Sequence, residues 1–252
     1  MKFTIDRVKP ITLTNQISKM TLMGSEIYFV LNTTNDKFES SVYLPTKDVV
    51  KCSEVSLKSI FESVDVLEKP LKLGFFDGNK VKNVLSFFDL SALSAEISYF
   101  DDGDYFIAES LILSDNTLKI SLKCLDPSLG FTMMSEDQTS IAFSEDSKVY
   151  SFTLNSMDLN KIAKLNTLDP TKLFSVYSNT EGVHVKGDNY DIIVDDSVKI
   201  SNPEVLIFKT FLPRIDQESY DVTVCQGAHN KILLDSRDTE TKVALNLALR
   251  PE

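Results

Sequence analysis

The sequence predicts an α+β fold in which antiparallel sheets dominate and a few short helices interrupt them. Short runs rich in Val, Ile, Phe, Tyr, Thr and Ser alternate with turn residues along the whole chain, a pattern typical of hairpins in series. Apolar residues recur with helical spacing in only a few segments. A connector rich in Pro, Gly and polar residues divides the chain into two halves of similar length. We therefore expect domains over residues 1–125 and 144–252, joined by a connector over 126–143.

Turn residues such as Asp101-Asp102-Gly103-Asp104 and Gly187-Asp188-Asn189 bound the predicted strands. The strands are expected over residues 26–31, 39–44, 71–76, 95–100, 105–113, 117–124, 149–154, 173–178, 183–186, 190–194, 220–225 and 242–249.

The clearest helix is predicted over residues 79–88, which carry apolar side chains at i, i+3, i+4 and i+7 with Asp77 before them as a cap. A second is predicted over 158–166, with an apolar side and a lysine side. Proline start and stop signals suggest a third over 203–212. Weaker helix candidates are residues 11–20 and 55–67.

A short internal repeat links the first two helices. Residues 77–84 and 158–165 both read Asp-x-Asn-Lys-(Val/Ile)-x-x-(Val/Leu), and each stretch follows a strand and precedes a hairpin. The shared order of strand, helix and several strands favours duplication over chance. The chain can then be divided into four units that begin near residues 3, 71, 149 and 197, with residues 46–69 as an insertion and a short lead strand over 198–200.

Composition indicates a globular protein with a strong acidic balance. The 252 residues include 26 basic and 37 acidic side chains, which gives a formal net charge of −11, and 42% are hydrophobic. The N-terminus lacks the apolar core of a signal peptide, and no apolar run approaches the roughly 18 residues of a membrane span. We therefore expect a cytosolic protein. The acidity by itself argues against a nucleic-acid partner.

The sparse residues argue against most catalytic and metal chemistry. Three widely spaced cysteines and two histidines form neither a disulfide framework nor a zinc pattern, and they make a Ser-His-Asp or Cys-His site improbable. His184 is expected to point away from the core and to face solvent, and His229 is expected in a turn. The pairs Asp101-Asp102 and Asp195-Asp196 fit turn chemistry better than an acid/base or metal site. We expect no catalytic residue, no metal and no cofactor.

The basic residues on the predicted helices are the candidate binding residues. For any single helix, a solvated lysine face is the simpler interpretation. The alternative is that the helices together line one surface that contacts phosphates, while the acidic strands and turns face elsewhere. The candidates are Lys80, Lys82, Lys161, Lys164, Lys209 and Arg214.

The connector supplies a second candidate site. Phe131, Met133 and Met134 stand in an otherwise polar segment. Met and Phe adapt to varied partners. The alternative is that these side chains anchor the loop to the body of the protein.

The order of these elements resembles that of the DNA sliding clamps, which are built from strand–helix–multistrand units joined in pairs by a connector. The resemblance covers residues 71–124, beginning Leu-Lys-Leu-Gly-Phe-Phe-Asp, and residues 149–252. The second stretch contains Phe-Thr-Leu-Asn-Ser-Met-Asp-Leu-Asn-Lys-Ile-Ala-Lys-Leu and Val-Leu-Ile-Phe-Lys-Thr-Phe-Leu-Pro-Arg. Two such domains are similar in length to the trimeric phage clamps rather than to the three-domain bacterial ones.

The resemblance implies a non-enzymatic ring of three copies, with sheets outside and helices lining the inner face, that encircles duplex DNA. The six basic residues would then meet phosphates. DNA polymerase and the clamp loader would bind near the connector, and some phage clamps also serve the transcription machinery. The residues implied in partner binding are Phe131, Met133, Met134, Leu249 and Pro251.

Two rival functions fit parts of the sequence. A strand-rich, acidic chain without catalytic residues also fits a structural or protein-interaction component, such as a virion protein, that binds no DNA. An enzyme with acidic active-site residues has little support and would require metal binding through Asp101, Asp102 or Asp104.

Overall fold

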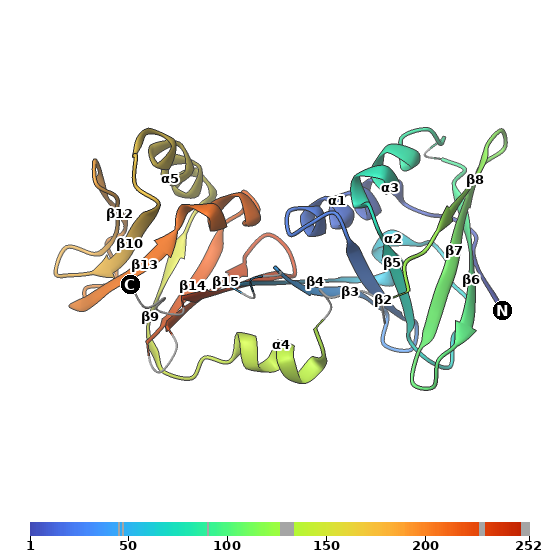
Figure 1. The fold of residues 1–252 in the computed structure, drawn as a ribbon, viewed down its shortest axis with the longest axis horizontal. Helices are drawn as coiled ribbons and strands as arrows, with labels where there is room; N and C mark the ends of the chain where they lie inside the picture. Colours follow the sequence, from blue (N-terminus) through green and yellow to red (C-terminus); the bar gives the residue numbers. More distant parts are fainter. Residues whose placement is uncertain (45, 47, 90, 127–133, 227–229, 248–252) are drawn as a thin grey trace. The chain divides into compact units, whose positions relative to one another are not determined.

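The computed structural model describes the chain apart from residues 45, 47, 90, 127–133, 227–229 and 248–252, and it confirms the predicted α+β class (Figure 1). The chain divides into two compact units. Unit 1 comprises Met1–Pro45 and Lys51–Met134, and unit 2 comprises Thr46–Val50 and Ser135–Glu252. No helix in the described ranges has the length and apolar character needed to cross a membrane.

Unit 1 is built on one sheet with the strand order β1-β6-β7-β5-β2-β3-β4, and β8 pairs with β7. The pairs β1–β6, β2–β3, β2–β5, β6–β7 and β7–β8 are antiparallel, and β5 and β7 share a short parallel contact. The elements are β1 (Lys2–Ile5), α1 (Pro10–Thr21), β2 (Ile27–Asn32), β3 (Lys37–Tyr43), β4 (Val49–Ser56), α2 (Leu57–Ile60), β5 (Leu71–Phe75), α3 (Gly78–Leu85), β6 (Ser94–Asp101), β7 (Phe106–Ser114) and β8 (Lys119–Lys123).

Unit 2 contains two antiparallel sheets with the strand orders β16-β15-β14-β9 and β12-β11-β10-β13. The elements are α4 (Glu136–Phe143), β9 (Lys148–Leu154), α5 (Ser156–Leu168), β10 (Leu173–Ser178), β11 (Val183–Lys186), β12 (Asp191–Asp195), β13 (Asn202–Phe208), the 3₁₀ helix η2 (Lys209–Arg214), β14 (Tyr220–Cys225), β15 (Asn230–Ser236) and β16 (Thr241–Leu247).

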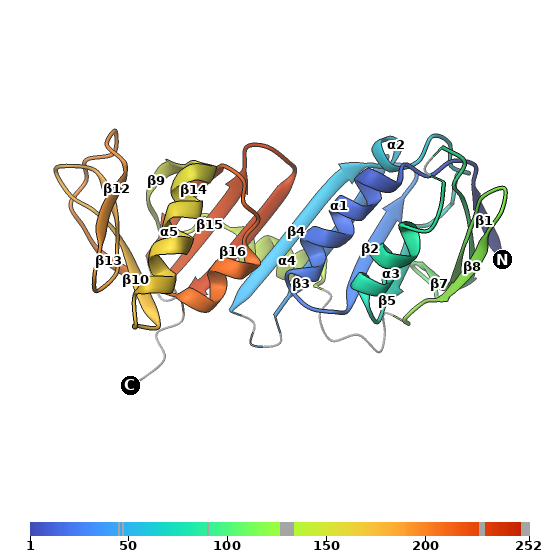
Figure 2. The same ribbon diagram turned by 90° about the horizontal axis from the view of Figure 1, so that it is seen from above.

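Helices α1 and α3 lie side by side on one face of the unit 1 sheet (Figure 2). Helix α1 begins at Pro10, whose fixed φ suits the first helical position, and buries positions 13, 16, 17 and 20. Helix α3 begins after Asp77, whose side chain accepts a hydrogen bond from the backbone N–H of Lys80. The weaker helix candidate at residues 11–20 is thus a full helix.

A polar contact ties α1 to β4 beneath it. The buried Ser53 hydroxyl donates a 2.6 Å hydrogen bond to Oε1 of Gln16, which is itself buried. The Lys51 ammonium, fully buried, donates to the carbonyl of Lys19 in the last turn of the helix at 3.0 Å. A cation at a helix C-terminus complements the helix dipole, so this contact fixes the C-terminal end of α1 on the sheet.

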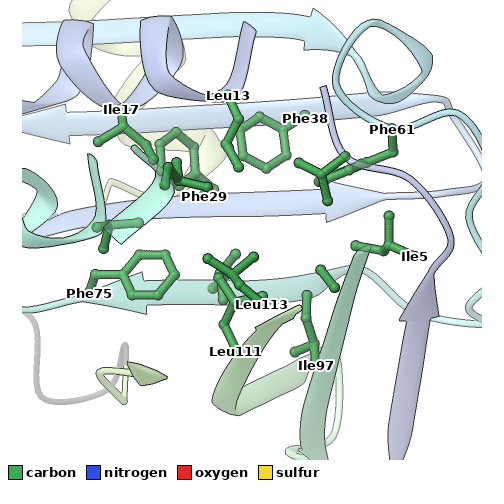
Figure 3. A pocket seen from close by; sticks show the side chains of 15 residues that line it. Ile5, Leu13, Ile17, Phe29, Phe38, Phe61, Phe75, Ile97, Leu111 and Leu113 are labelled. Carbon is green, nitrogen blue, oxygen red and sulfur yellow. The ribbon is translucent and has the colours of Figure 1, made fainter. Parts of the chain in front are cut away.

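The core between the helices and the sheet of unit 1 contains one small apolar cavity (Figure 3). Leu13 and Ile17 of α1 face it from the helix side, and the stacked rings of Phe29 and Phe38 line it from the sheet, 4.6 Å apart between centroids. The cavity has a volume of about 20 Å³, room for about one water molecule. An apolar void of this size stays dry, so we regard it as a packing defect rather than a ligand site.

Several predicted elements are wrong in type. Residues 203–208 belong to β13 rather than to a helix, because Val205 and Ile207 alternate with exposed positions at a period of two. Residues 49–56 form β4 rather than part of an insertion, and the helix candidate at 55–67 shrinks to the single turn α2. The connector contains α4, which Ser135 and Gln138 stabilise as a reciprocal capping box. Strand β15 was not predicted.

The turn between β11 and β12 depends on a close approach that only glycine permits. A Cβ atom on Gly187 would meet the carboxylate of Asp169 and the ring of Tyr190 at less than contact distance. We predict that Gly187→Ala destabilises the protein by about 1–3 kcal/mol through overpacking. Thermal or denaturant unfolding of the variant measures this change.

Gly24→Ala is the matched control. A Cβ atom on Gly24 has no neighbour within 4 Å. Its substitution should leave the free energy of unfolding within about 0.5 kcal/mol of the parent. Equal effects of the two substitutions would contradict the steric argument for Gly187.

Candidate nucleic-acid interface

The outward side of α1 and α3 forms the unit 1 helix face, which we define by Asn15, Ser18, Lys80, Lys82 and Asn83. These positions point away from the buried stripes of the two helices; Asn15, Lys80 and Asn83 are exposed, and Ser18 and Lys82 are half-buried. Neither helix contains an Asp or Glu residue. Amide, hydroxyl and ammonium groups are the donors that proteins use on phosphate oxygens. This face therefore presents donors and positive charge without a competing carboxylate from its helices.

The outward side of α5 forms the unit 2 helix face, centred on Lys161 and Lys164. Both lysines are exposed, while Leu159 and Ile162 on the opposite side are buried. Asp158, the single acidic residue of the helix, is occupied in the N-cap: its backbone N–H donates to Asn155 Oδ1 at 2.8 Å, and its carboxylate accepts from Asn155 Nδ2 at 2.6 Å. The cap thus holds this carboxylate at the start of the helix.

Charge is segregated between the helices and the rest of the chain. Helices α1, α3, α5 and η2 together contain seven basic residues and one acidic residue, against 26 and 37 for the whole chain. Within the part of the chain that the structure describes, no ion pair involves Lys80, Lys82, Lys161 or Lys164. Their charges are therefore available to an external anion.

Lys209 is not part of this surface. Its side chain is only 14% exposed, and its ammonium lies 3.1 Å from the carboxylate of Asp169, whose side chain is fully buried. It also donates to the carbonyl oxygen of Asp169 at 2.9 Å. The prediction that Lys209 contacts phosphate is corrected here, because a buried ion pair already neutralises its charge. Arg214, at the end of η2, is half-buried.

The Asp169 carboxylate joins three parts of unit 2: the loop after α5, the β11–β12 turn and η2. It accepts hydrogen bonds from the backbone and hydroxyl of Thr171, in the loop that leads from α5 to β10, and from the backbone N–H of Asp188 in the β11–β12 turn. Asp169 is itself the C-cap residue of α5, and its ion-pair partner Lys209 is the first residue of η2. The hydrogen bonds from Thr171, together with those from Lys209 and Asp188, hold the pKa of Asp169 well below its usual range.

The predicted partner residues fall mostly outside the described part of the chain. Phe131, Met133, Leu249 and Pro251 lie there, so their placement stays a prediction. Met134 is half-buried, and its backbone N–H donates to the carbonyl of Ser41 at 3.3 Å.

Helix α4 follows directly in the connector. Lys231 donates to the carbonyl of Ile141 in its last turn and to the hydroxyl of Ser144. The helix is therefore capped at both ends, although the sequence showed only a polar connector.

His184 does not face solvent as predicted. Its ring is stacked on Tyr177 with 4.7 Å between centroids, and only 7% of its side chain is exposed. Nδ1 lies 2.9 Å from Asp191 Oδ1, and Nε2 lies 3.1 Å from Asn179 Oδ1. Burial and the hydrogen bond to Asp191 raise the pKa of Tyr177 to about 12. The prediction of a solvent-facing ring was wrong because it did not include the hydrogen bonds and stacking that bury the ring.

The first aspartate of each pair, Asp101 and Asp195, stabilises a turn by accepting hydrogen bonds from residues that follow it. Asp101 accepts from the backbone of Gly103 and pairs with Lys69 at 2.7 Å. Asp195 accepts from Ser197 and from the backbone of Thr153. No group of three or more metal-ligating side chains occurs among the residues that the structure describes, and His229 lies outside them.

Solved structures of sliding clamps share this fold. Proliferating cellular nuclear antigen from Entamoeba histolytica is 13% identical, with a TM-score of 0.68 and 98% of each chain covered. The PCNA of A. fulgidus, bound to the C-terminal region of FEN-1, is 13% identical, with a TM-score of 0.65 and 99% of each chain covered. The DnaN sliding clamp (DNA polymerase III subunit beta) of Pseudomonas aeruginosa is 11% identical with a TM-score of 0.62, and the match covers all of this chain and 66% of the clamp.

No protein-family model and no curated protein sequence matches the chain. The structural likenesses establish that the chain has the DNA sliding-clamp fold over nearly its whole length, which confirms the fold that the resemblance implied.

The Asp169 ion pair yields a pH-dependent prediction. Because its folded-state pKa lies below the unfolded value of about 3.9, the carboxylate stabilises the fold at neutral pH, and this contribution is lost as pH falls below about 4. Asp169→Asn should therefore lower the melting temperature at pH 7, and the difference from the parent should shrink toward pH 3.

Asp221→Asn is the control for this change. Asp221 is 65% exposed and lies 3.7 Å from Arg237, a surface pair worth little. A difference between Asp169→Asn and the parent that stays constant from pH 7 to pH 3 would contradict the assignment of the charge as the stabilising element.

Proposed function

We propose that this chain, which has the sliding-clamp fold, is a non-enzymatic processivity clamp: a ring of three copies that encircles duplex DNA and tethers a DNA polymerase. The observation that carries the proposal is the charge of the two helix faces on a chain of net charge −11. The phage origin, the polymerase, the clamp loader and a role with the transcription machinery belong to this proposal, as extensions of the resemblance in length and element order.

Contact with DNA would be independent of base sequence. Lys80, Lys82, Lys161 and Lys164 would neutralise phosphates and release counterions, and phosphate contacts carry no direct sequence information. Asn15 and Asn83 add uncharged donors on the same helix faces. Such contacts move along the duplex without a preferred register, as a sliding ring requires. Retention would come from ring closure rather than from affinity.

Ring closure requires a surface on each unit that fits another copy. Strand β8 is an edge of the unit 1 sheet, and β12 is an edge of its sheet in unit 2. An exposed edge offers unpaired backbone groups to another chain, and a head-to-tail contact closes into a ring when its rotation allows. We propose that β8 of one copy pairs with β12 of the next.

The side chains of the two edges are complementary. On β8, Lys119 and Lys123 flank Ser121 on one face; on β12, Asp191 and Asp195 flank Ile193. Centring Ser121 on Ile193 in an antiparallel pair places Lys123 opposite Asp191, and an opposite-charge cross-strand pair contributes about 0.2–1 kcal/mol. The register of β12 shifts between Ile193 and Asp195, so Lys119 lies near Asp195 without standing directly opposite it. The buried Leu122 and the half-buried Ile192 then share the other face.

Partner proteins would bind near the connector. Within the described residues, Met134 and α4 belong to this region, and Phe131, Met133, Leu249 and Pro251 extend the proposal. Short apolar peptides from polymerase and clamp loader are the proposed ligands.

A cysteine pair tests ring closure. We predict that Ser121→Cys combined with Ile193→Cys gives oxidised products up to a covalent trimer on a non-reducing gel, because position 121 of one copy lies opposite 193 of the next. Light scattering of the parent protein should report the mass of three chains.

The native thiols would also oxidise, so all these variants are made with Cys52→Ser, Cys124→Ala and Cys225→Ala. On that background Ser121→Cys alone and Ile193→Cys alone are the controls, since each can join at most two copies. Lys123→Cys with Asp191→Cys tests the antiparallel direction, and Lys119→Cys with Asp191→Cys tests the parallel one. A parent protein that is monomeric at all concentrations and stimulates no polymerase would contradict the clamp and would favour the acidic structural component.

Neutralising the helix lysines tests DNA contact. Each Lys→Gln change at 80, 82, 161 or 164 should weaken binding to a duplex oligonucleotide and lower the slope of log K against log salt by about 0.9 per lost phosphate contact. Fluorescence anisotropy over a salt series measures both. Lys242→Gln, at a surface ion pair with Asp235, is the matched control and should leave the slope unchanged.

A further inference from the structure

The unit 2 helix face carries an apolar side chain at each end. Met157 and Leu168 are 79% and 78% exposed, and Lys161 and Lys164 lie between them. The four positions follow the spacing i, i+4, i+7 and i+11, which places them within an arc of about 60° on the helix and separates the outer two by about 16 Å. They form one stripe, which we call the α5 stripe: apolar, basic, basic, apolar.

The helices of unit 1 share the spacing of the apolar ends but not the two basic residues between them. The exposed Ile11 (67%) of α1 and the half-buried Leu22, the C-cap residue of this helix, stand at this spacing around Asn15 and Ser18. Around α3, Phe76 precedes the N-cap residue and Phe87 follows the C-cap residue, and they are 57% and 68% exposed. Lys80 and Asn83, two residues of the unit 1 helix face, lie between these two rings in the sequence.

Five large apolar side chains at the ends of these three helices, those of Ile11, Phe76, Phe87, Met157 and Leu168, are more than half exposed. Together they favour a partner that covers the helix ends. The partner must also accept the basic residues between them. A second copy facing α5 with its own α3 or α5 would set lysine against lysine, and like charges at close range are destabilising. A polyanion with apolar edges satisfies both parts of the stripe. Duplex DNA has this chemistry, because its phosphates alternate with deoxyribose rings.

We propose that each helix lies across one DNA backbone strand, with the central Lys or Asn side chains on phosphates and the apolar ends against deoxyribose on either side. The inference rests on the proposed function and adds a salt-independent, apolar component to DNA contact. Apolar contact with sugars lacks a base-specific partner, so it is compatible with sliding.

The salt dependence of binding separates the two components. The double variant Met157→Gln/Leu168→Gln keeps side-chain length and helix propensity while removing the apolar ends. We expect it to weaken binding to a duplex oligonucleotide by about threefold or more at every salt concentration, through lost apolar burial, with the slope of log K against log salt unchanged. Lys161→Gln/Lys164→Gln should instead lower the slope.

The control is Val66→Gln, at an exposed apolar residue (83%) outside the helix faces and the connector, which should bind as the parent does. Parent-like binding by the Met157/Leu168 variant, with weaker binding by the lysine variant, would overturn the apolar contact and leave the clamp proposal standing. Parent-like binding by both variants would count against the clamp proposal itself. A loss of trimer mass in the Met157/Leu168 variant would assign the apolar ends to a second copy and so overturn the DNA contact.

Discussion

The buried carboxylate of Asp169 holds together the part of unit 2 on which its helix face is built. A charged group without solvent is stable only when several donors and a countercharge surround it, and Asp169 receives these from Thr171, Asp188 and Lys209. Thr171 closes the loop directly after α5, while Asp188 and Lys209 come from the β11–β12 turn and from η2. The end of α5 is therefore fixed against these two elements.

This arrangement decides which charges reach the surface. Lys209 neutralises Asp169 inside unit 2, so the exposed charge of the face comes from Lys161 and Lys164. Gly187 belongs to the same constraint, because the turn can approach the carboxylate only where no Cβ intervenes.

The negative charge of the chain reflects how its turns are closed. Asp101 and Asp195 accept backbone hydrogen bonds in the loops that join strands. Asp115 does the same, and hydrogen bonds from the backbones of Asp89, Thr117 and Leu118 lower its pKa to about 2. Many strands require many such turns, and the acidic residues accumulate there.

Helices α3 and α5 each start with one capping side chain, from Asp77 and Asn155, whereas α1 starts at Pro10 without one. These three helices contain only one carboxylate, that of Asp158. Salt screens charges beyond roughly 10 Å, so a phosphate in contact with Lys161 senses that lysine more than distant turns. Net charge is thus a poor guide to the local partner of either helix face.

The sequence predicted the fold class and the helices whose apolar period was regular, because burial of one face leaves a direct trace in residue order. It misjudged residues 203–208, where the prolines suggested helix ends while Val205 and Ile207 already showed strand alternation. Helix α4 was missed because its signal lies in a capping box rather than in an apolar stripe.

The sequence did not predict side-chain contacts between residues that lie far apart in the chain. Lys209 and Asp169 are 40 positions apart, and nothing local distinguishes Lys209 from an exposed helical lysine. The same holds for His184, whose burial depends on Tyr177, Asn179 and Asp191 rather than on its own strand period.

A sliding ring places opposite demands on its two kinds of contact. Contacts between copies must be specific, and backbone pairing at an edge with lysine opposite aspartate fixes a register, since a one-residue slip would turn every side chain to the wrong face. Contacts with DNA must be unspecific, because any preferred register would halt movement.

Under the proposed function, the two helix faces would meet the second demand because they carry no group that reads bases. They offer ammonium, amide and apolar groups but no bidentate arginine of the kind that reads guanine, and their one carboxylate, Asp158, is held in the cap of α5. Sequence-independent groups would then meet the duplex, and the matched charges of β8 and β12 would carry the specificity of assembly.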